Sequence, residues 1–239
     1  MTLAKRIIPT ILVKGRIAYK GERFKADRSV GSALSIAQVH ARRGVDELTI
    51  LDVSATTEGR GPDLDMVREL SEGCFIPITV GGGVKSLHDI DALLRAGADK
   101  VCIGAAARDD WGLLMGASDR FGKQAVVVSC DAGSVEPRRE DAAAYVKDMQ
   151  ACGAGEIVLQ SVDRDGLMCG YDIDLIREVS AAVNVPVIAS GGCSGYPDML
   201  AAIKAGADAV AAGALFQFTD ATPKGAARYL EEHGICVRH

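Results

Sequence analysis

The chain has 239 residues, 48% of them hydrophobic and only 5% aromatic, so it is long enough for one large α/β barrel or two small domains. Its formal net charge is −5 and it holds no basic tract that could follow a phosphate backbone, which argues against nucleic-acid binding. No apolar run reaches the roughly 18–20 residues that a membrane span needs, and no signal-type cleavage site follows the apolar start, so we expect a cytoplasmic protein without a membrane segment.

Short apolar runs alternate with amphipathic stretches along the whole chain. We expect strands at 6–12, 47–53, 77–83, 100–106, 125–131, 156–162, 186–192 and 209–215, with helices such as 86–99 and 196–208 between them. Eight strands that alternate with helices predict a (β/α)8 barrel, or TIM barrel, formed as a single domain by residues 1–239. A doubly wound open sheet is the alternative, but it would not account for an internal repeat.

The two halves of the chain resemble each other at one fixed offset. IPITVGGG, which begins at position 76, matches VPVIASGG, which begins at position 185, and each is followed by an AGAD motif. The same offset of 109 residues separates Gly97 from Gly206 and Gly44 from Gly153. Because one offset recurs across three strand–helix units, the sequence predicts two duplicated half-barrels.

Glycine clusters follow the third and seventh expected strands, and each has a partner after the next strand. In a (β/α)8 barrel the active site lies at the C-terminal strand ends, where such clusters would meet. Glycine lets backbone N–H groups approach a phosphate, and the following helix favours negative charge. Two symmetry-related clusters predict a ligand with a phosphate at each end, although the glycines could simply form tight turns. The candidate phosphate-binding residues are Gly82, Gly83, Gly104, Ala105, Gly166, Gly191, Gly192, Gly213 and Ala214.

Carboxylates at strand ends are the candidate acid–base groups. Asp131 ends the apolar run AVVVSC, where turn chemistry does not explain a carboxylate, and Asp52 ends the second expected strand with the same argument in weaker form. Asp163 and Asp165, in SVDRDG, lie where a general acid or a hydroxyl-binding carboxylate could act. An Asp-rich turn that uses Gly166 as its left-handed residue would look the same.

Charged residues begin four of the expected strands, at the end opposite the glycine clusters. Alternating signs that converge on the barrel axis predict a closed ring of salt bridges, which could act as a gate. The alternative is ordinary solvated charge on the barrel floor. The four residues are Arg6, Glu47, Lys100 and Glu156.

The sequence gives no signature of a metal site or a cofactor. The seven cysteines are odd in number and form no C-x-x-C pair, so we expect reduced thiols rather than disulfides or zinc. No G-x-G-x-x-G motif follows the first strand, so we expect no dinucleotide. The histidines are scattered along the chain, at His40, His88, His233 and His239.

Together these features resemble the cyclase subunit family of imidazole glycerol phosphate synthase. The matching segments run in order over nearly the whole chain: LAKRII (3–8), DELTILD (46–52), TVGGGV (79–84), RAGADKV (95–101), QAVVVSCDA (124–132), GAGEIVLQSVDRDG (153–166), GYD (170–172), IASGG (188–192), AGADA (205–209) and HGICVR (233–238).

The resemblance implies a lyase-type synthase subunit that works in a heterodimer with a glutaminase. Ammonia from the glutaminase would pass the charged gate, rise along the barrel axis and attack a bisphosphorylated ribulosyl aminoimidazole intermediate. The resemblance also implies that Asp99 docks the glutaminase and that Asp131 is a catalytic acid or base. Lys20 best matches the family's mobile lysine, in KGRIAYKGERF.

The chain departs from the family on the substrate side. Leu12 stands where the family has its first catalytic aspartate, and Gly104 stands where it has an asparagine. The segment between Asp131 and Glu156 is too short for a small hairpin that the family carries there. A branch of similar proteins that serves acetamidino-sugar formation also carries leucine at the first position, and DRSVG (27–31) resembles its first loop. That branch implies a separate sugar amidotransferase as a further partner.

Three hypotheses follow for the function. The first is an ammonia-channelling barrel whose nitrogen goes to another phosphorylated or sugar acceptor, which Leu12 favours because leucine cannot transfer a proton. The second is a cyclase of histidine biosynthesis, which yields imidazole glycerol phosphate and aminoimidazole carboxamide ribotide (AICAR). The third is a non-catalytic subunit that activates a glutaminase.

Overall fold

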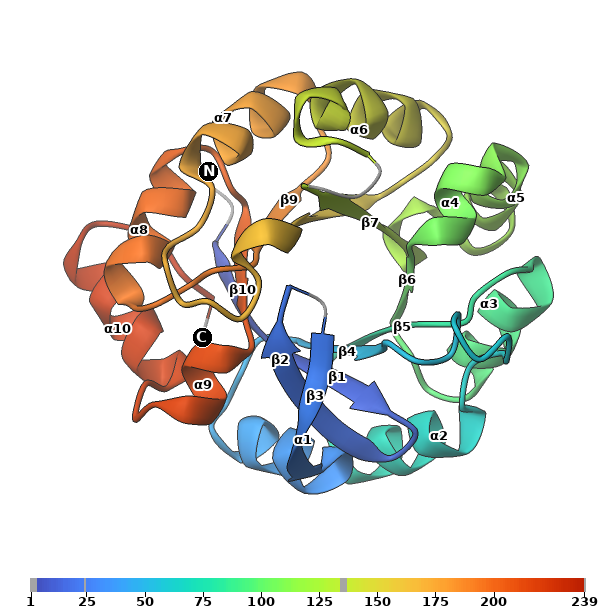
Figure 1. The fold of residues 1–239 in the computed structure, drawn as a ribbon, viewed down its shortest axis with the longest axis horizontal. Coiled ribbons are helices and arrows are strands. Elements are labelled where there is room, and N and C mark those ends of the chain that lie inside the picture. Colours follow the sequence, from blue (N-terminus) through green and yellow to red (C-terminus); the bar gives the residue numbers. More distant parts are fainter. Residues whose placement is uncertain (1–3, 24, 134–136, 239) are drawn as a thin grey trace.

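In the computed structural model, which describes residues 4–23, 25–133 and 137–238, parallel strands form a closed barrel with helices around it (Figure 1). The last strand pairs with the first, Arg6 beside Ala209, so the predicted (β/α)8 barrel is confirmed. The barrel strands are β1 (Arg6–Lys14), β4 (Leu48–Asp52), β5 (Ile78–Gly81), β6 (Lys100–Ile103), β7 (Val126–Ala132), β8 (Glu156–Ser161), β9 (Val187–Ser190) and β10 (Ala209–Ala212).

Some positions singled out in the sequence lie outside the described residues. They are Leu3 at the start of LAKRII, Phe24 at the end of KGRIAYKGERF, His239, and residues 134–136 in the short connection after β7.

The helices lie on the outside of the barrel. They are α1 (Ala33–Arg42), α2 (Leu64–Gly73), α3 (Leu87–Arg95), α4 (Ala105–Asp109), α5 (Trp111–Phe121), α6 (Ala142–Ala151), α7 (Ile173–Ala182), α8 (Tyr196–Lys204), α9 (Ala214–Phe218) and α10 (Pro223–Glu232). Short 3-10 turns are η1 (Lys123–Ala125), η2 (Arg139–Asp141) and η3 (Val162–Arg164). Side-chain caps begin several helices: the Asp63 carboxylate accepts from the Met66 N–H at α2, and Asp172 accepts from Leu175 at α7.

The predicted duplication is visible in the bounds of the elements. Helices α1, α2, α3 and α4 begin and end 109 residues before α6, α7, α8 and α9, as Ala33 and Ala142 illustrate for the first pair. Strands β6 and β10 show the same offset. Each half therefore places its loops at the same end of the barrel, on opposite sides of the axis.

Several expected elements are shorter in the structure. The expected strands 100–106 and 209–215 end at Ile103 and Ala212 because α4 and α9 begin two residues later. The expected helices 86–99 and 196–208 end at Arg95 and Lys204. Beyond them, Gly97 and Gly206 take φ values of 110° and 120°, which end the helical path.

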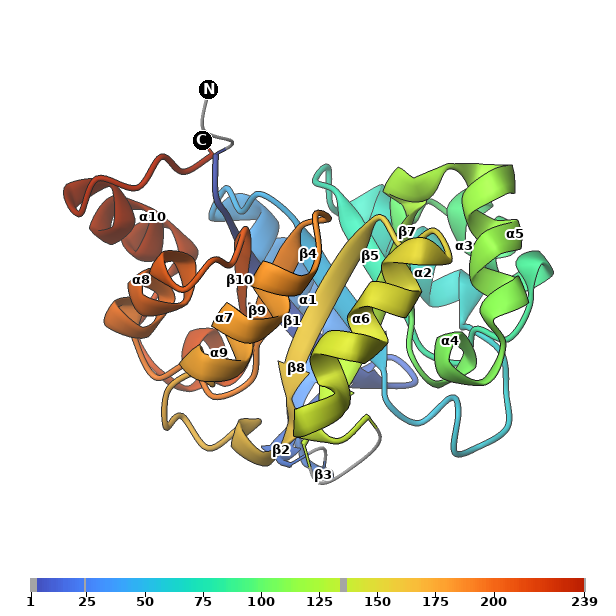
Figure 2. The same ribbon diagram turned by 90° about the horizontal axis from the view of Figure 1, so that it is seen from above.

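The expected loop after the first strand is instead a β-hairpin. β2 (Ile17–Glu22) pairs antiparallel with the end of β1, Leu12 beside Tyr19, and β3 (Lys25–Ser32) pairs with β2. β1 therefore runs to Lys14 rather than to residue 12. The hairpin lies at the opposite end of the barrel from the two chain termini (Figure 2).

Two apolar clusters fill the molecule. The larger lies between the strands and the helices and includes Ile11, Ile50, Leu114 and Leu230. The smaller fills the barrel interior with Ile8, Cys102, Val127, Val158, Ile188, Ala209 and Ala211. All seven cysteines are free thiols, and only Cys169 and Cys236 are exposed. Among the described residues, no helix is long and apolar enough to cross a membrane.

Candidate active site

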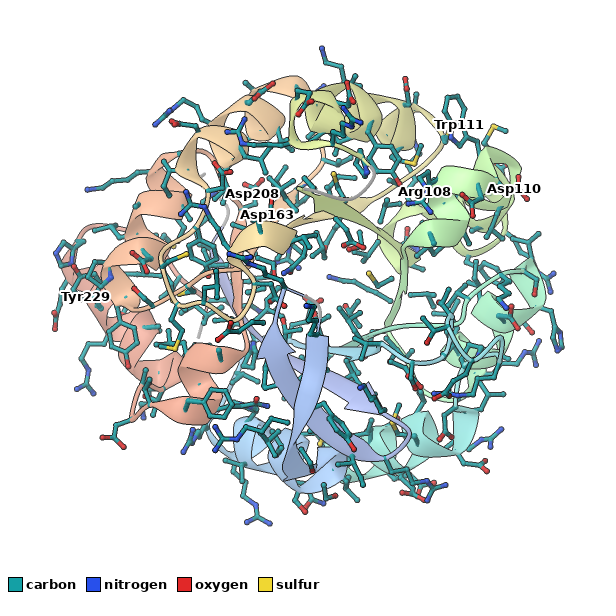
Figure 3. The ribbon with its side chains drawn as sticks, viewed as in Figure 1. Arg108, Asp110, Trp111, Asp163, Asp208 and Tyr229 are labelled. Atoms are coloured by element: carbon teal, nitrogen blue, oxygen red, sulfur yellow. The ribbon has the colours of Figure 1, made fainter. Side chains whose placement is uncertain are left out.

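A cavity of about 700 Å³ opens at the C-terminal ends of the barrel strands. Lys20, Asp131 and Asp165 line it, as do all nine candidate phosphate-binding residues. Asp163 does not line it. A Cβ built on Gly133 would lie 3.0 Å from the Asp163 carboxylate oxygen, so that side chain is directed toward the β7 loop. Figure 3 labels Asp163 among the side chains of the molecule.

The cavity reaches far down the barrel axis. Its deep wall includes Thr49, Cys102 and Val158. Each lies two residues after a member of the predicted charge ring in the sequence, so each is the next residue whose side chain points into the barrel. The cavity therefore ends one layer of side chains above the barrel floor.

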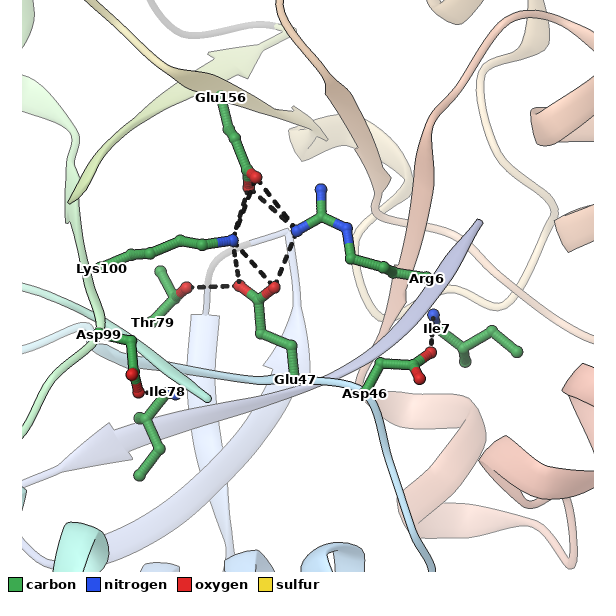
Figure 4. A network of polar contacts seen from close by, with 9 residues as sticks. All are labelled: Arg6, Ile7, Asp46, Glu47, Ile78, Thr79, Asp99, Lys100 and Glu156. Atoms are coloured by element: carbon green, nitrogen blue, oxygen red, sulfur yellow. Dashed lines mark hydrogen bonds and ion pairs between the residues drawn. The ribbon is translucent and has the colours of Figure 1, made fainter. Parts of the chain in front are cut away.

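The four predicted charges form a closed ring at that floor (Figure 4). Arg6 Nη1 lies 2.8 Å from Glu47 Oε2 and 3.1 Å from Glu156 Oε1. Lys100 Nζ lies 3.0 Å from Glu47 Oε2 and 3.1 Å from Glu156 Oε1. Thr79 Oγ1 donates to Glu47 Oε1 at 2.6 Å. Two cations and two carboxylates thus close the bottom of the barrel without net charge.

Burial and ion pairing act against each other in the ring. Burial opposes the charge of Glu47, but Lys100, Thr79 and Arg6 outweigh it and lower the pKa of Glu47. Burial likewise opposes the charge of Arg6, yet the carboxylates of Glu156 and Glu47 leave its pKa raised. Glu47 and Arg6 are therefore held in their charged forms, which favours the salt bridges that they make.

Asp131 is a half-buried carboxyl in the cavity wall. Burial raises its pKa, and the nearby Asp165 carboxylate acts in the same direction. Ser129 Oγ donates to Asp131 Oδ1 at 2.5 Å, and the charge of Arg108 on α4 also favours the ionised form. The balance makes Asp131 easier to protonate than an ordinary aspartate, which suits a group that moves protons.

Leu12 occupies the position in the first half that Asp131 occupies in the second. Leu12 is the register partner of Leu51 on β4, and Asp131 is the register partner of Gln160 on β8. Leu51 and Gln160 are 109 residues apart, the offset of the duplication. Leu12 lines the cavity and is 8% exposed, so no carboxylate faces Asp131 from β1.

Lys20 reaches the cavity from the hairpin. The side chain is 5% exposed, and a Cβ on Gly213 would overlap its ammonium nitrogen. Burial lowers the pKa of Lys20, against the effect of the Asp165 carboxylate. The hairpin tip also rests on the loop after β8: the Arg23 N–H donates to the Asp165 carbonyl at 2.9 Å, and a Cβ on Gly166 would overlap the Gly21 carbonyl oxygen.

The two glycine pairs that follow β5 and β9 differ from Gly104 in what their missing side chains allow. Gly82, Gly83, Gly191 and Gly192 have φ between 72° and 111°, and a Cβ on any of them would crowd a backbone oxygen, as at Gly82 and Asp52. Tight turns alone would therefore select these glycines. Gly104 has a negative φ and open space beside it, so packing gives no reason for its missing side chain.

Asp52 has a structural explanation that the sequence did not show. Arg60 Nη1 lies 2.7 Å from Asp52 Oδ2, and Oδ1 accepts from the Ser54 and Ala55 N–H groups at 3.0 and 3.1 Å. Its carboxylate thus shapes the loop between β4 and α2. The D-x-S spacing at Asp52 is the signal that could have indicated this turn.

Asp99 lies at the opposite end of the barrel from the cavity, beside the ring residue Lys100. Its Oδ2 accepts from the Ile78 N–H at 2.8 Å, while the residue itself is exposed. Asp208, 109 residues later, accepts from the Val187 N–H at 3.2 Å in the same way and also pairs with Lys5 at 2.9 Å. One oxygen of Asp99 thus fixes the start of β5 while its charge remains on the surface.

Five polar residues of the barrel strands that line the cavity were missed in the sequence: Thr10, Thr49, Ser129, Gln160 and Ser190. Each lies two residues from another cavity-lining residue of the same strand, at the strand end or below it. Counting inward-facing positions back from the strand ends would have found them. Among the described residues, no group of three or more His, Cys, Asp or Glu side chains could hold a metal ion.

Comparisons with known proteins show what the chain is similar to. A family model described as "Histidine biosynthesis protein" matches residues 6–222. The chain is also 41% identical over 252 aligned positions to imidazole glycerol phosphate synthase subunit HisF of Pyrobaculum aerophilum. That alignment covers 100% of both chains.

Proposed function

The chain belongs to the histidine biosynthesis protein family, and from this we propose that it is a cyclase-type synthase subunit that adds ammonia to a phosphorylated substrate. In this proposal the ammonia comes from a glutaminase that binds the barrel floor as the second subunit of a heterodimer. The observation that carries the proposal is the shared axis of the ring and the cavity. The cavity ends one layer above the salt-bridge ring, and Asp131 lies on its wall.

In this proposal the ring, the barrel interior and the cavity mouth each have a separate role. The ring would act as the gate, which opens when the salt bridges of Lys100 or Arg6 part. Neutral ammonia would then pass through an interior of small and apolar side chains. At the mouth, Asp131 would exchange protons with the attacking nitrogen or the leaving group, because its raised pKa makes it easier to protonate than an ordinary aspartate. Lys20 and Asp165 would complete the acid–base groups.

The first candidate reaction is the one that the family and its relative favour. In it, ammonia and the ribulosyl aminoimidazole intermediate give imidazole glycerol phosphate and AICAR. The two glycine clusters across the mouth would hold the two phosphates. No cofactor is needed, because the reaction requires only proton transfer and the placement of ammonia.

The second candidate is ammonia transfer to another acceptor, with a sugar amidotransferase as a further partner. A specific observation favours it: Leu12 stands at the position equivalent to Asp131 and cannot transfer a proton. Loss of a positioned general acid or base lowers a rate by about 10²–10⁴. The cyclase reaction would then be slow or absent in the natural protein.

The deciding experiment is turnover of the ribulosyl aminoimidazole intermediate with excess ammonium salt, so that no glutaminase is needed. The natural protein is compared with Leu12→Asp, and Leu51→Asp serves as a control with a carboxylate at the neighbouring register position. Turnover by the natural protein at an ordinary enzymatic rate establishes the cyclase. Turnover only by Leu12→Asp supports the second candidate and makes Leu12 the decisive difference. If no form turns over, the cyclase assignment falls, and a non-catalytic activator becomes testable through glutaminase stimulation.

A further inference from the structure

The wall of the cavity carries more negative than positive charge. Among the described residues, five carboxylates but only two ammonium groups line it: Asp52, Asp109, Asp110, Asp131 and Asp165 against Lys20 and Lys85. Arg60 offsets the charge of Asp52, and Arg108 lies 3.3 Å from Asp109. The carboxylates that remain still outnumber the two lysines, so the wall alone gives an incoming anion no net attraction.

The hairpin of β2 and β3 carries the opposite charge. Between positions 14 and 28 the sequence has six lysines and arginines but two carboxylates, in a chain whose net charge is −5. The hairpin extends toward the barrel axis in Figure 1 and lies at the end away from the chain termini in Figure 2. Its cations are therefore concentrated beside the opening through which a ligand enters.

Most cations of the hairpin already have partners, but two at its tip do not. Arg16 lies in a salt bridge, Arg28 lies over an aromatic ring, and Lys20 is buried in the cavity. Arg23 and Lys25, which we call the tip pair, are exposed and make no side-chain hydrogen bond or ion pair with the described part of the chain. Their charges are thus available to act on a ligand in solution.

The backbone of Arg23 also indicates a use for its side chain. Its φ is 52°, in the left-handed region that glycine and asparagine adopt most easily. Its N–H donates to the Asp165 carbonyl at 2.9 Å, which places the tip over the loop at the edge of the cavity. A turn selected for its backbone alone would favour glycine at this position, so the arginine needs another reason.

From these observations we propose that the tip pair steers small phosphorylated anions into the cavity by raising the positive potential at its mouth. The inference rests on the phosphorylated substrate of the proposed function and goes beyond it, because it concerns the arrival of the ligand rather than the groups that hold it. A cationic patch at the entrance raises the rate of productive encounters with an anion. Neither Arg23 nor Lys25 lines the cavity, so the tip pair acts before binding.

Two exposed cysteines allow this potential to be measured without any substrate. Cys169 lies in the loop after β8, next to the cavity-lining Met168, whereas Cys236 lies at the barrel floor beside Lys5. At each cysteine, the rate of alkylation by anionic iodoacetate is divided by the rate with neutral iodoacetamide, and mass spectrometry follows both products. The fraction of thiolate cancels in this ratio, so the ratio reports the potential that the anion meets.

The test variant combines Arg23→Asn with Lys25→Gln, and asparagine suits the left-handed backbone at position 23. At about 10 mM ionic strength we expect the ratio at Cys169 to fall about threefold, because two nearby positive charges are lost. At about 150 mM the difference should shrink, because salt screens charges that are more than about 8 Å apart. The ratio at Cys236 should not change.

The matched control combines Lys123→Gln with Arg228→Gln, which removes two exposed charges outside the hairpin. The proposal is overturned if the ratio at Cys169 does not change in the tip variant, or if it falls equally in the control or at Cys236.

Turnover separates a failure of steering from a failure of the proposed function. With a phosphorylated substrate, the tip variant should lower kcat/KM and leave kcat unchanged, and an equal fall in both would overturn steering. If the natural protein turns over no phosphorylated substrate, the proposed function falls, and the ratio at Cys169 alone decides whether the tip pair attracts anions.

Discussion

The Asp131 carboxyl lies among groups that act on its charge in opposite directions. Burial and Asp165 favour the neutral form, while Ser129 and Arg108 favour the ionised form. Such a group is poised for proton transfer and at the same time weakens the resting fold. A substitution that removes only the charge lets its effect on proton transfer and its effect on stability be measured separately.

We expect Asp131→Asn to lower ammonia-dependent turnover by about 10²–10⁴. The raised pKa of Asp131 means that its contribution to stability is fully present below the pKa of the unfolded chain and is lost as the pH rises through the folded pKa. The variant should therefore be at least as stable as the natural protein at pH 7 and relatively less stable near pH 4. Urea unfolding at both pH values checks this, and a variant that loses stability only at pH 7 would contradict it.

The sequence identified Asp131 and the glycines because they interrupt apolar strand patterns at strand ends. It could not separate Asp163 from Asp165. The two are adjacent in one turn, and the 3-10 turn η3 (Val162–Arg164) directs Asp163 toward Gly133 and leaves Asp165 on the cavity wall. Gln160 was missed because a polar residue inside a strand carries no local signal for the direction of its side chain.

The hairpin of β2 and β3 is held over the second half of the mouth by a few close contacts. In one of them the Gly21 carbonyl packs against Gly166, which has room for it because Gly166 carries no Cβ. Arg28 on β3 also lies 5.0 Å from the ring of Phe218 on α9. The hairpin could not be predicted, because β3 is mostly polar and forms by pairing with β2 rather than through a pattern of its own.

We expect Gly166→Ala to lift the hairpin and to expose it to proteases several-fold faster than in the natural protein. Gly59→Ala is the matched control: Gly59 has φ 71° and Gly166 has φ 74°, but nothing lies near the Cβ position of Gly59. Both variants should lose about 1–2 kcal/mol from the left-handed backbone. Limited proteolysis measures the difference, and equal cleavage of the two variants would rule out the steric contact as the cause.

The overall barrel could be predicted because eight expected strands alternate with helices, and the 109-residue repeat favoured it over an open sheet. The charges of the ring could be placed at the strand starts in the same way. Whether they close into a ring depends on the tilt of the strands, which no local pattern contains. The structure shows that closure, with both carboxylates contacting both cations.

We expect Lys100→Met to impair the passage of ammonia from the barrel floor to the cavity. Removing one cation leaves Glu47 and Glu156 paired only with Arg6, which should cost about 1–3 kcal/mol, below the range for a fully buried pair. Glutamine-driven turnover by the complex should fall at least fivefold more than ammonium-driven turnover. Lys5→Met is the control, because Lys5 pairs with Asp208 outside the ring. If both nitrogen sources are affected equally, the ring is not a gate.

The partner should recognise the charge of Asp99 on the barrel floor. Asp99→Asn keeps an oxygen that can accept from the Ile78 N–H, so the start of β5 should persist. We expect the affinity for the glutaminase to fall about five- to tenfold, as for a rim charge that meets a partner charge. Asp208→Asn is the symmetry-matched control, and calorimetric titration of the glutaminase measures both. An equal loss in the two variants would point to strand geometry rather than docking.

The closure of the barrel leaves only one open strand edge in the described sheet. β10 pairs with β1, so the outer side of β3 is the edge at which another chain could add a strand. Exposed edges of this kind promote aggregation, and natural proteins protect them with charge and irregular backbone. β3 carries the exposed Lys25 and Arg28, and Gly31 breaks its extended path with φ 124°. The hairpin beside the cavity mouth is thereby also protected against self-association, so neutralising the two cations of β3 would lower solubility even where the barrel itself remains folded.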